Sequence, residues 1–558
     1  MTTRTPFSVS AQARDPGFAE SAIRILTRVL GDRAGIPVQR VLPGAAADLL
    51  LIQRPGMGGE GYAVERGAGA GGRVTVAAAG SLGLLAGVGK WLRSSHFDGT
   101  AFHPGTWSGA SSPRATVRGM YLPCRGNWYG YATTDEFQCY VEDLALWGIN
   151  TICCYLPETA DPDSPDGARI VERNRALLRA VREVGLRTAL IREPNMVHTG
   201  VPAEVLAPPF RDTDPPRRGT GGPRVCPSHP DGWKLILRSM EQYLDGYEDI
   251  GLDYVVAFPY DGGGCGCPGC WPWGARGYLR LCKELSRLAR ARHPGCKFVV
   301  GTWCFDVCET PDGEFEGLDR ELRRDRSWAD YIMADAHEDF PRYPLEHGSP
   351  GGLPLITFPE ISMWGRFPWG GFGANPFPAR LQRLWNQVSR LCDGGFPYSE
   401  GIYEDLNKFV VSQFYWDAER PAADSVREYA AYEFSPAVAD AVSLAVQRFE
   451  ATLPRATWRG EDIEQAWALC QQADRQLPPG AREAWRWRVL YLRGLIDHEL
   501  FTHPGQPHSE PCDQAFEELT RIYHAETGWG PVSPRSRRCL ERLRQQAAPP
   551  PPPGAENR

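Results

Sequence analysis

From residue 116 onward, the chain alternates between short segments typical of buried strands and longer amphipathic segments typical of helices. The strand-like segments are 117–123, 149–157, 187–196, 252–261, 297–305, 328–336, 354–362 and 394–400. Strands that alternate with helices pair in parallel, because each helix returns the chain to the same end of the sheet. Eight such units within about 300 residues predict a (β/α)8 TIM barrel.

Two of the eight units are irregular in sequence. The third carries an insertion rich in Pro, Gly and Arg at 200–225, and the sixth has no clear helical pattern between Pro341 and Gly352. In the first unit, we expect the helix to begin at a Thr134 cap and to end at Gly148.

The barrel, predicted at 116–428, is flanked by segments of a different pattern. Residues 1–112 predict a small α/β domain, with helices at 18–31 and 81–95 and strands at 47–53 and 73–79. Residues 430–545 predict an α-helical domain, because only helical periodicity remains there. Its expected helices are 437–453, 461–477, 481–501 and 536–546. The Pro-rich tail, 546–558, predicts a disordered or extended segment.

Charge and hydropathy exclude several classes of partner. The 558 residues carry 61 Lys and Arg against 68 Asp and Glu, a net charge of −7. This balance argues against nucleic acid or an anionic membrane as the main partner. The chain has no apolar run of about 20 residues, the length of a membrane span. Its first residues lack the apolar stretch of a signal peptide, so we expect a cytoplasmic location.

Acidic and aromatic residues gather where the predicted strands end, which is where barrel enzymes build their active sites. The candidate catalytic carboxyl groups are Asp261, Asp335, Glu360 and Glu400. The candidate substrate-binding residues are Arg125, Asn127, Trp128, Arg192, Glu193, Tyr260, Trp303, His337, Trp364, Arg366 and Tyr403. Aromatic faces stack on sugar rings, and cleavage of a glycosidic bond needs two carboxyl groups, one on each side of it. This set therefore favours a carbohydrate substrate.

Other chemistries leave no comparable signal in the sequence. We find no GxSxG, P-loop, HExxH or dinucleotide fingerprint, and so expect no organic cofactor.

A cluster of cysteines follows the fourth predicted strand. Cys265, Cys267 and Cys270 form a CxCxxC motif directly after Asp261 and three glycines. Three thiolates at this spacing can share one tetrahedral zinc ion, and Cys226 is the expected fourth ligand, with Cys304 or Cys308 as alternatives. We expect such a zinc to be structural. Reduced cysteines in a tight loop are the competing interpretation.

The domain order resembles that of the α-glucuronidases, and the segments 60–67 and 73–80 resemble the small domain that precedes the barrel in hexosaminidases and α-glucuronidases. VCPSHPDGW at 225–233, followed by DYVVAFPYDGGGCGCPGC at 253–270, resembles an uncharacterised group of glycoside-hydrolase-like proteins. Where that group has Asn-Asp, this chain has Tyr260-Asp261. Hexosaminidases place Asp-Glu at this strand end, so Gly262 counts against their substrate-assisted mechanism.

The resemblance implies roles for the candidate acids. Asp261 is the expected general acid, because related barrel hydrolases keep theirs at the end of strand four. Glu360 is the expected base or nucleophile. Asp335 is its alternative, since the α-glucuronidase layout has acids on strands six and seven. Glu400 is next and is expected to bind sugar hydroxyls.

We therefore predict an exo-acting glycoside hydrolase for short oligosaccharides or glycosides. Uronic-acid substrates are one option, with a carboxylate partner among Arg125, Arg192, Arg366 and Lys408. The alternatives are a non-hydrolytic carbohydrate-binding protein, a β-N-acetylhexosaminidase-like enzyme, and a lyase or isomerase with a metal-bound sugar acid. The expected partner is a small carbohydrate, with a homodimer left open and neither nucleic acid nor membrane involved.

Overall fold

The computed structural model describes most of the chain. The described residues are 5–67, 72–99, 101–125, 127–158, 164–197, 201–209, 224–306, 313–336, 339–362, 374–453, 460–503 and 509–524. Within these ranges, no helix is both long and apolar enough to cross a membrane.

A mixed sheet forms the N-terminal part of the molecule. Its strands, in spatial order, are β2 (Val38–Arg40), β1 (Phe7–Gln12), β3 (Leu49–Gln53), β5 (Val74–Ala78), β4 (Tyr62–Arg66) and β8 (Gly109–Ser111). β4 is antiparallel to both of its neighbours, and the other pairs are parallel. A small hairpin of β6 (His96–Phe97) and β7 (Phe102–His103) follows. The sequence predicted β3 and β5 but not β1, β2 or β8.

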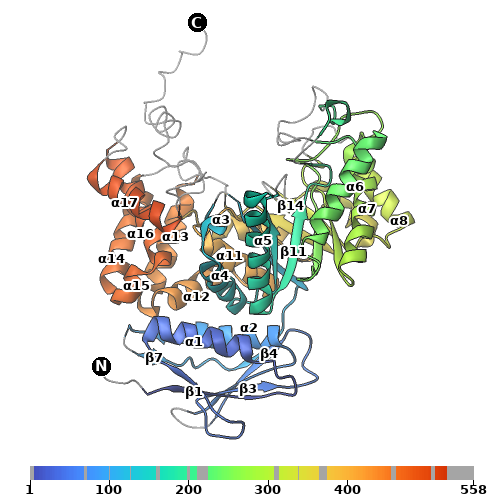
Figure 1. The fold of residues 1–558 in the computed structure, drawn as a ribbon. Coiled ribbons are helices and arrows are strands. Elements are labelled where there is room, and N and C mark those ends of the chain that lie inside the picture. The colour runs from blue at the N-terminus through green and yellow to red at the C-terminus, as the bar shows by residue number, and fades with distance from the viewer. Residues whose placement is uncertain are drawn as a thin grey trace.

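Two helices, α1 (Glu20–Ala34) and α2 (Ser81–Arg93), lie between this sheet and the barrel (Figure 1). Helix α2 approaches the end of α4 (Thr134–Leu146) very closely. A Cβ atom at Gly89 would lie 1.8 Å from the carbonyl oxygen of Leu146, so only glycine fits there. Arg93 donates a hydrogen bond to the same oxygen.

Eight parallel strands close into a barrel, which confirms the predicted fold class. In chain order they are β9 (Val117–Pro123), β10 (Thr151–Tyr155), β11 (Arg187–Arg192), β12 (Tyr254–Ala257), β13 (Lys297–Gly301), β14 (Tyr331–Ala336), β15 (Leu355–Pro359) and β16 (Cys392–Gly395). Each lies within or overlaps one of the eight predicted segments.

Helices follow the strands around the barrel. They are α3 (Trp128–Tyr131), α4, α5 (Pro165–Val184), α6 (Pro230–Asp245), α7 (Gly277–Arg292), α8 (Glu314–Arg324), α9 (Arg342–His347), α10 (Pro378–Val388) and α11 (Asp405–Trp416). Short 3₁₀ turns occur at Ala203–Val205, Trp273–Ala275 and Pro350–Gly352. The sequence did not predict α3, α8, α9 or α11.

The start of helix α4 differs in one detail from the sequence prediction. Its cap is Thr133 rather than Thr134, because Thr133 accepts a hydrogen bond from the Glu136 backbone while the Glu136 carboxylate accepts one from the Thr133 backbone. This reciprocal capping box satisfies two backbone donors that the helix itself leaves unpaired.

The C-terminal part is helical, as predicted, and packs against one side of the barrel (Figure 1). It contains α12 (Ala422–Glu433), α13 (Ala439–Ala451), α14 (Gly460–Gln476), α15 (Pro479–Glu483), α16 (Trp485–Thr502) and α17 (Glu510–Ile522), with a 3₁₀ turn at Pro436–Val438. The predicted helix at 536–546 and the tail at 546–558 lie outside the described residues.

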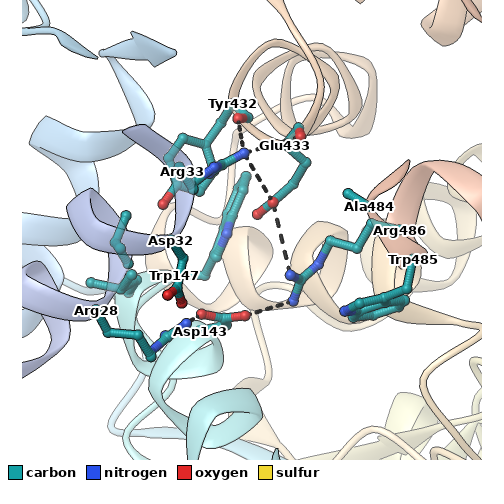
Figure 2. Close-up of a pocket in the computed structure, with 12 residues that line it drawn as sticks. Arg28, Asp32, Arg33, Asp143, Trp147, Tyr432, Glu433, Ala484, Trp485 and Arg486 are labelled. Atoms are coloured by element: carbon teal, nitrogen blue, oxygen red, sulfur yellow. Dashed lines mark hydrogen bonds and ion pairs between the residues drawn. The ribbon is translucent and has the colours of Figure 1, made fainter. Parts of the chain in front are cut away.

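A cavity of about 160 Å³ lies where α1, α4, α12 and the start of α16 meet. Figure 2 shows that charged side chains of opposite sign line it. Arg486 is 3.0 Å from Asp143, which also pairs with Arg28 at 2.6 Å, and Arg33 is 3.6 Å from Glu433. Because these charges neutralise one another, and because this end of α4 lies opposite the carboxyl ends of the strands, we interpret the cavity as a structural junction.

Arg486 is the residue on which this junction depends. Besides Asp143, it binds Asp405 of α11 at 2.7 Å and lies 3.9 Å from Glu433. We predict that Arg486→Met lowers the free energy of unfolding by about 3–5 kcal/mol, because it removes the cation that three largely buried carboxylates share. Denaturant titration followed by tryptophan fluorescence measures the loss.

Arg488→Met is the matched control on the same helix. Arg488 pairs with Glu518 at 2.6 Å near the surface, where such pairs contribute about 1 kcal/mol or less. Equal losses in the two variants would contradict the proposed importance of the junction.

Candidate active site and metal cluster

The barrel interior is apolar up to the level at which the strands end. Side chains alternate between the two faces of a strand, so every second residue points inward. Ile191, Met333, Phe358 and Phe396 belong to the cluster that fills this interior, and Tyr398 packs against it. The next residues on the same inward face of each strand therefore point into the barrel mouth.

Four carboxyl groups come next along these inward-facing positions. Glu193, Asp335 and Glu360 lie two residues beyond Ile191, Met333 and Phe358, and Glu400 lies two beyond Tyr398. The strand register supports this placement, because Asp335 is paired with Phe358 and Glu360 with Tyr398. The structure thus brings together three of the four predicted catalytic acids and adds Glu193 to them.

Glu193 has a strongly perturbed carboxyl group. Only 5% of the residue is exposed, and its Oε2 atom has no hydrogen-bond partner among the described residues. Burial raises its pKa to about 7, and the nearby charge of Asp261 acts in the same direction against the opposing effect of Arg125. Glu193 can therefore hold a proton near neutral pH.

Asp261 lies beside Glu193 but reaches the site differently. Its backbone is left-handed, with φ 78°, and this turn ends the alternation of strand β12. A Cβ atom at Gly262 would lie 2.5 Å from Met196 Sδ and 3.4 Å from Glu193 Oε1, so the turn rests directly on the Glu193 side chain. Asp261 itself is exposed at the rim, although the surrounding loops still desolvate its carboxyl group enough to raise its pKa.

Arg125 extends over the mouth from the end of β9. Its guanidinium stacks on the Tyr155 ring, 4.2 Å from the ring centre. Burial would lower its pKa, but Tyr121, Tyr155, Glu193 and Glu400 raise it overall. Arg125 is therefore an exposed cation within electrostatic range of acids from two different strands.

Glu360 and Glu400 are held in place by neighbours from their own strand ends. Glu360 is 2% exposed, and its Oε1 accepts hydrogen bonds from the Ser362 backbone at 2.6 Å and hydroxyl at 2.9 Å. Tyr398 donates its hydroxyl hydrogen to Glu400. Glu404 accepts a hydrogen bond from the Glu400 backbone at 2.6 Å and so orders this loop. Ser362 is not among the predicted site residues, although it directly follows the strand end that carries Glu360.

Three predicted ligands point away from the mouth. Arg192 donates to Glu158 at 2.9 Å and to Ser239 at 2.7 Å. Tyr260 is fully buried and donates to Glu314 of α8 at 2.5 Å. Lys408, one of the four suggested uronate partners, is also fully buried, and it donates to Tyr140 at 2.9 Å. These three side chains bond to residues outside the mouth, and they stabilise the loops around it instead of facing a substrate.

The remaining predicted ligands form the walls or fall outside the description. Trp303 is half-buried and stacks on Phe258 with ring centres 5.3 Å apart. Trp128 packs on Tyr140, and Tyr403 packs on Tyr523 of the C-terminal part. Asn127 and Tyr403 are buried, yet Asn127 Oδ1 and the Tyr403 hydroxyl have no hydrogen-bond partner among the described residues. His337, Trp364 and Arg366 lie outside the described residues.

The four predicted cysteine ligands meet in one cluster beside the mouth. The sulfur atoms of Cys226, Cys265, Cys267 and Cys270 all lie within 4.8 Å of one another. Cys226 Sγ is 3.5 Å from Cys265 Sγ and 3.6 Å from Cys267 Sγ. Metal–sulfur bonds of about 2.3 Å in a tetrahedron place the sulfurs about 3.8 Å apart, so the cluster is in position to bind a metal ion.

Two further observations bear on this donor set. A hydrogen bond from Cys265, with another from Ser228, lowers the pKa of Cys270 to about 5, so the cluster favours a thiolate, the form that binds metals. The alternative ligand Cys304 does not belong to the group, and Cys308 lies outside the described residues.

No family model and no curated protein sequence matches the chain. Solved structures are similar in fold. A family GH115 4-O-methyl-α-glucuronidase with specificity for decorated arabinogalactans has a TM-score of 0.62 and 11% identity, over 98% of this chain and 80% of its own. A family GH89 glycoside hydrolase from Clostridium perfringens, in complex with GlcNAc-α-1,4-galactose, has a TM-score of 0.60 and 11% identity. The match covers 90% of this chain and 64% of that protein.

A β-hexosaminidase from Streptomyces plicatus has a TM-score of 0.51 and 14% identity, over 82% of this chain and 93% of its own. These neighbours are glycoside hydrolases built on (β/α)8 barrels, which confirms the resemblance predicted from the sequence at the level of fold. The comparisons leave the cysteine motif untested.

The raised pKa of Glu193 predicts a specific dependence of stability on pH. An unfolded glutamate titrates near 4.3, so the protonated side chain stabilises the fold fully below that value, and this stability is lost as the pH rises through about 7. Glu193→Gln removes the titration. We expect its free energy of unfolding, relative to the unsubstituted protein, to rise by about 2–3 kcal/mol between pH 4.5 and pH 8.

Denaturant titrations at the two pH values measure this difference. Glu284→Gln, which alters a partly exposed carboxyl group on α7, is the control and should show no such rise. A difference that stays constant with pH would show that Glu193 titrates normally.

Proposed function

We propose that the chain is a glycoside hydrolase whose active site lies at the carboxyl ends of the barrel strands. The observation that carries this proposal is the layer formed by Glu193, Asp335, Glu360 and Glu400 directly above the apolar interior. Carboxyl groups projecting into one mouth from different strands supply the two-sided arrangement that glycosidic cleavage needs. The unsatisfied Asn127 and Tyr403 atoms add buried polar groups that a sugar hydroxyl can pair with.

In this proposal, the neighbouring carboxyl groups of Asp261 and Glu193 hold the proton that is donated to the leaving oxygen of the glycosidic bond. The sequence assigned this role to Asp261, and the raised pKa values of both groups support a protonated carboxyl here. Glu360, oriented by Ser362, is the proposed base or nucleophile. Asp335 is its alternative, and Glu400 is proposed to bind a sugar hydroxyl.

The proposed substrate is a short oligosaccharide or glycoside cut from its end. A uronic acid is favoured by Arg125, whose exposed guanidinium can pair with a carboxylate. The similarity to a 4-O-methyl-α-glucuronidase points to the same class of sugar. The cytoplasmic location and the homodimer remain predictions from the sequence.

Hydrolysis of nitrophenyl glycosides, including uronides and N-acetylhexosaminides, tests the proposal. We expect Glu193→Gln, Asp261→Asn and Glu360→Gln each to lower turnover of the accepted glycoside by more than tenfold while the fold persists, because these groups act mainly in the transition state. Glu284→Gln on the outer helix α7 is the control and should retain full activity.

The outcomes separate the alternatives. If Asp261→Asn and Glu360→Gln both keep more than about a tenth of the activity, a loss under about 1.4 kcal/mol, the assignment moves to Asp335 with Glu400. Saturable sugar binding without turnover of any glycoside would favour a non-hydrolytic binding protein. Turnover of N-acetylhexosaminides alone would favour the hexosaminidase alternative.

We also propose zinc as the ion for the four-cysteine cluster, because four thiolates in a tetrahedron are a typical structural zinc site. Elemental analysis of the purified protein should find about one zinc per chain. Absence of metal, together with a fold that survives chelation, would remove this proposal.

A further inference from the structure

The four cysteines come from two different loops of the barrel rim. Cys226 lies between β11 and α6, at the end of the long insertion of the third unit. Cys265, Cys267 and Cys270 lie between β12 and α7, in the fourth unit. An ion bound by all four sulfurs therefore joins two loops that are separated by about 40 positions in the chain.

The same two loops are joined by a buried side chain next to the cluster. Asn195 is fully buried, and its amide donates to Val225 O at 3.0 Å and to Gly264 O at 2.9 Å. Its Oδ1 accepts a hydrogen bond from the Gly264 backbone at 2.9 Å. Val225 and Gly264 directly precede two of the cysteines, and Asn195 lies two positions after Glu193, so the cluster and the mouth share one set of contacts.

The turn that carries Asp261 lies between the cluster and Glu193. It runs from Asp261 to Gly264 and enters the cluster at Cys265. Its backbone packs so tightly that a Cβ atom at Gly263 would lie 2.6 Å from Pro259 O and 3.3 Å from Asn195 Oδ1. A chain with three consecutive glycines is free to adopt many conformations, so an external restraint is needed to hold this one.

We infer that zinc held by Cys226, Cys265, Cys267 and Cys270 acts as a clamp that fixes the 261–264 turn against the Glu193 carboxyl group. This inference rests on the proposed zinc and gives it a role in the proposed active site. The clamp is a positioning device. Four protein ligands complete the tetrahedron and leave no position for water or a sugar, so the lyase or isomerase alternative gains no support from this cluster.

Hydrogen exchange with mass spectrometry tests the clamp without depending on catalysis. In Cys267→Ser, zinc content should fall well below one per chain, and amide exchange should become at least tenfold faster in peptides covering 193–197, 224–229 and 258–266. Peptides from α13 and α14, far from the cluster, should be unchanged. Chelation of the unsubstituted protein, followed by return of zinc, should produce and then reverse the same pattern, which keeps the test valid if the variant fails to fold.

Two further variants separate the clamp from a general packing defect. Cys267→His offers zinc another ligand at the partly exposed position of the four and should retain both metal and protection. Cys282→Ser removes a buried thiol of α7 that lies outside the cluster and should leave exchange in these peptides unchanged.

Loss of zinc with unchanged exchange at 193–197 and 258–266 would overturn the clamp, as would an equal effect of Cys282→Ser. The failure of the proposed function has a different signature. In that case, zinc content and exchange would follow the expectations above while no glycoside is turned over.

Discussion

Closure of the barrel depends on a steric constraint at its last strand. β16 inserts between β15 and β9, and a Cβ atom at Gly394 would lie 1.7 Å from the carbonyl oxygen of Val117. A Cβ atom at Gly395 would lie 2.1 Å from the carbonyl oxygen of Thr357. Gly394 also has φ 103°, which L-residues with a side chain rarely adopt. Only two consecutive glycines allow the strands to meet, and the common rim of strand ends follows from that closure.

Once the barrel is closed, strand alternation decides what the mouth contains. Apolar inward-facing side chains fill the interior, and the next inward-facing positions are the carboxyl groups of Glu193, Asp335, Glu360 and Glu400. The edge of an apolar core also affects proton affinity, because burial of a carboxyl group favours its neutral form. Glu193, which is buried beneath the Gly262 turn, shows this effect in its raised pKa.

The C-terminal helices contribute to the mouth as well as to packing. Arg493 of α16 donates a hydrogen bond to the Ala374 carbonyl oxygen at 2.5 Å and to Asn375 Oδ1 at 3.3 Å, in the segment that leads to α10. Tyr523 packs its ring against Tyr403, 5.9 Å between centres, behind the end of β16. The helical part therefore supports the strand-seven and strand-eight loops, in the same way that the cysteine cluster supports those of strands three and four.

The sequence alone predicted the strand–helix order, the eight strands, the flanking segments and the four cysteines that cluster, because strand period, helix period and cysteine spacing are local properties of the chain. It also identified the strand ends as acidic and aromatic. It did not show that Glu193 and Asp261 reach the barrel mouth while the adjacent Arg192 and Tyr260 point away from it. Adjacent strand residues lie on opposite faces, and a left-handed turn at Asp261 interrupts this alternation. The proton affinity of Glu193, the burial of Lys408 and the distance between the two cysteine-bearing loops were decided only by the tertiary structure, because each depends on groups that are remote in the chain and that close packing brings together.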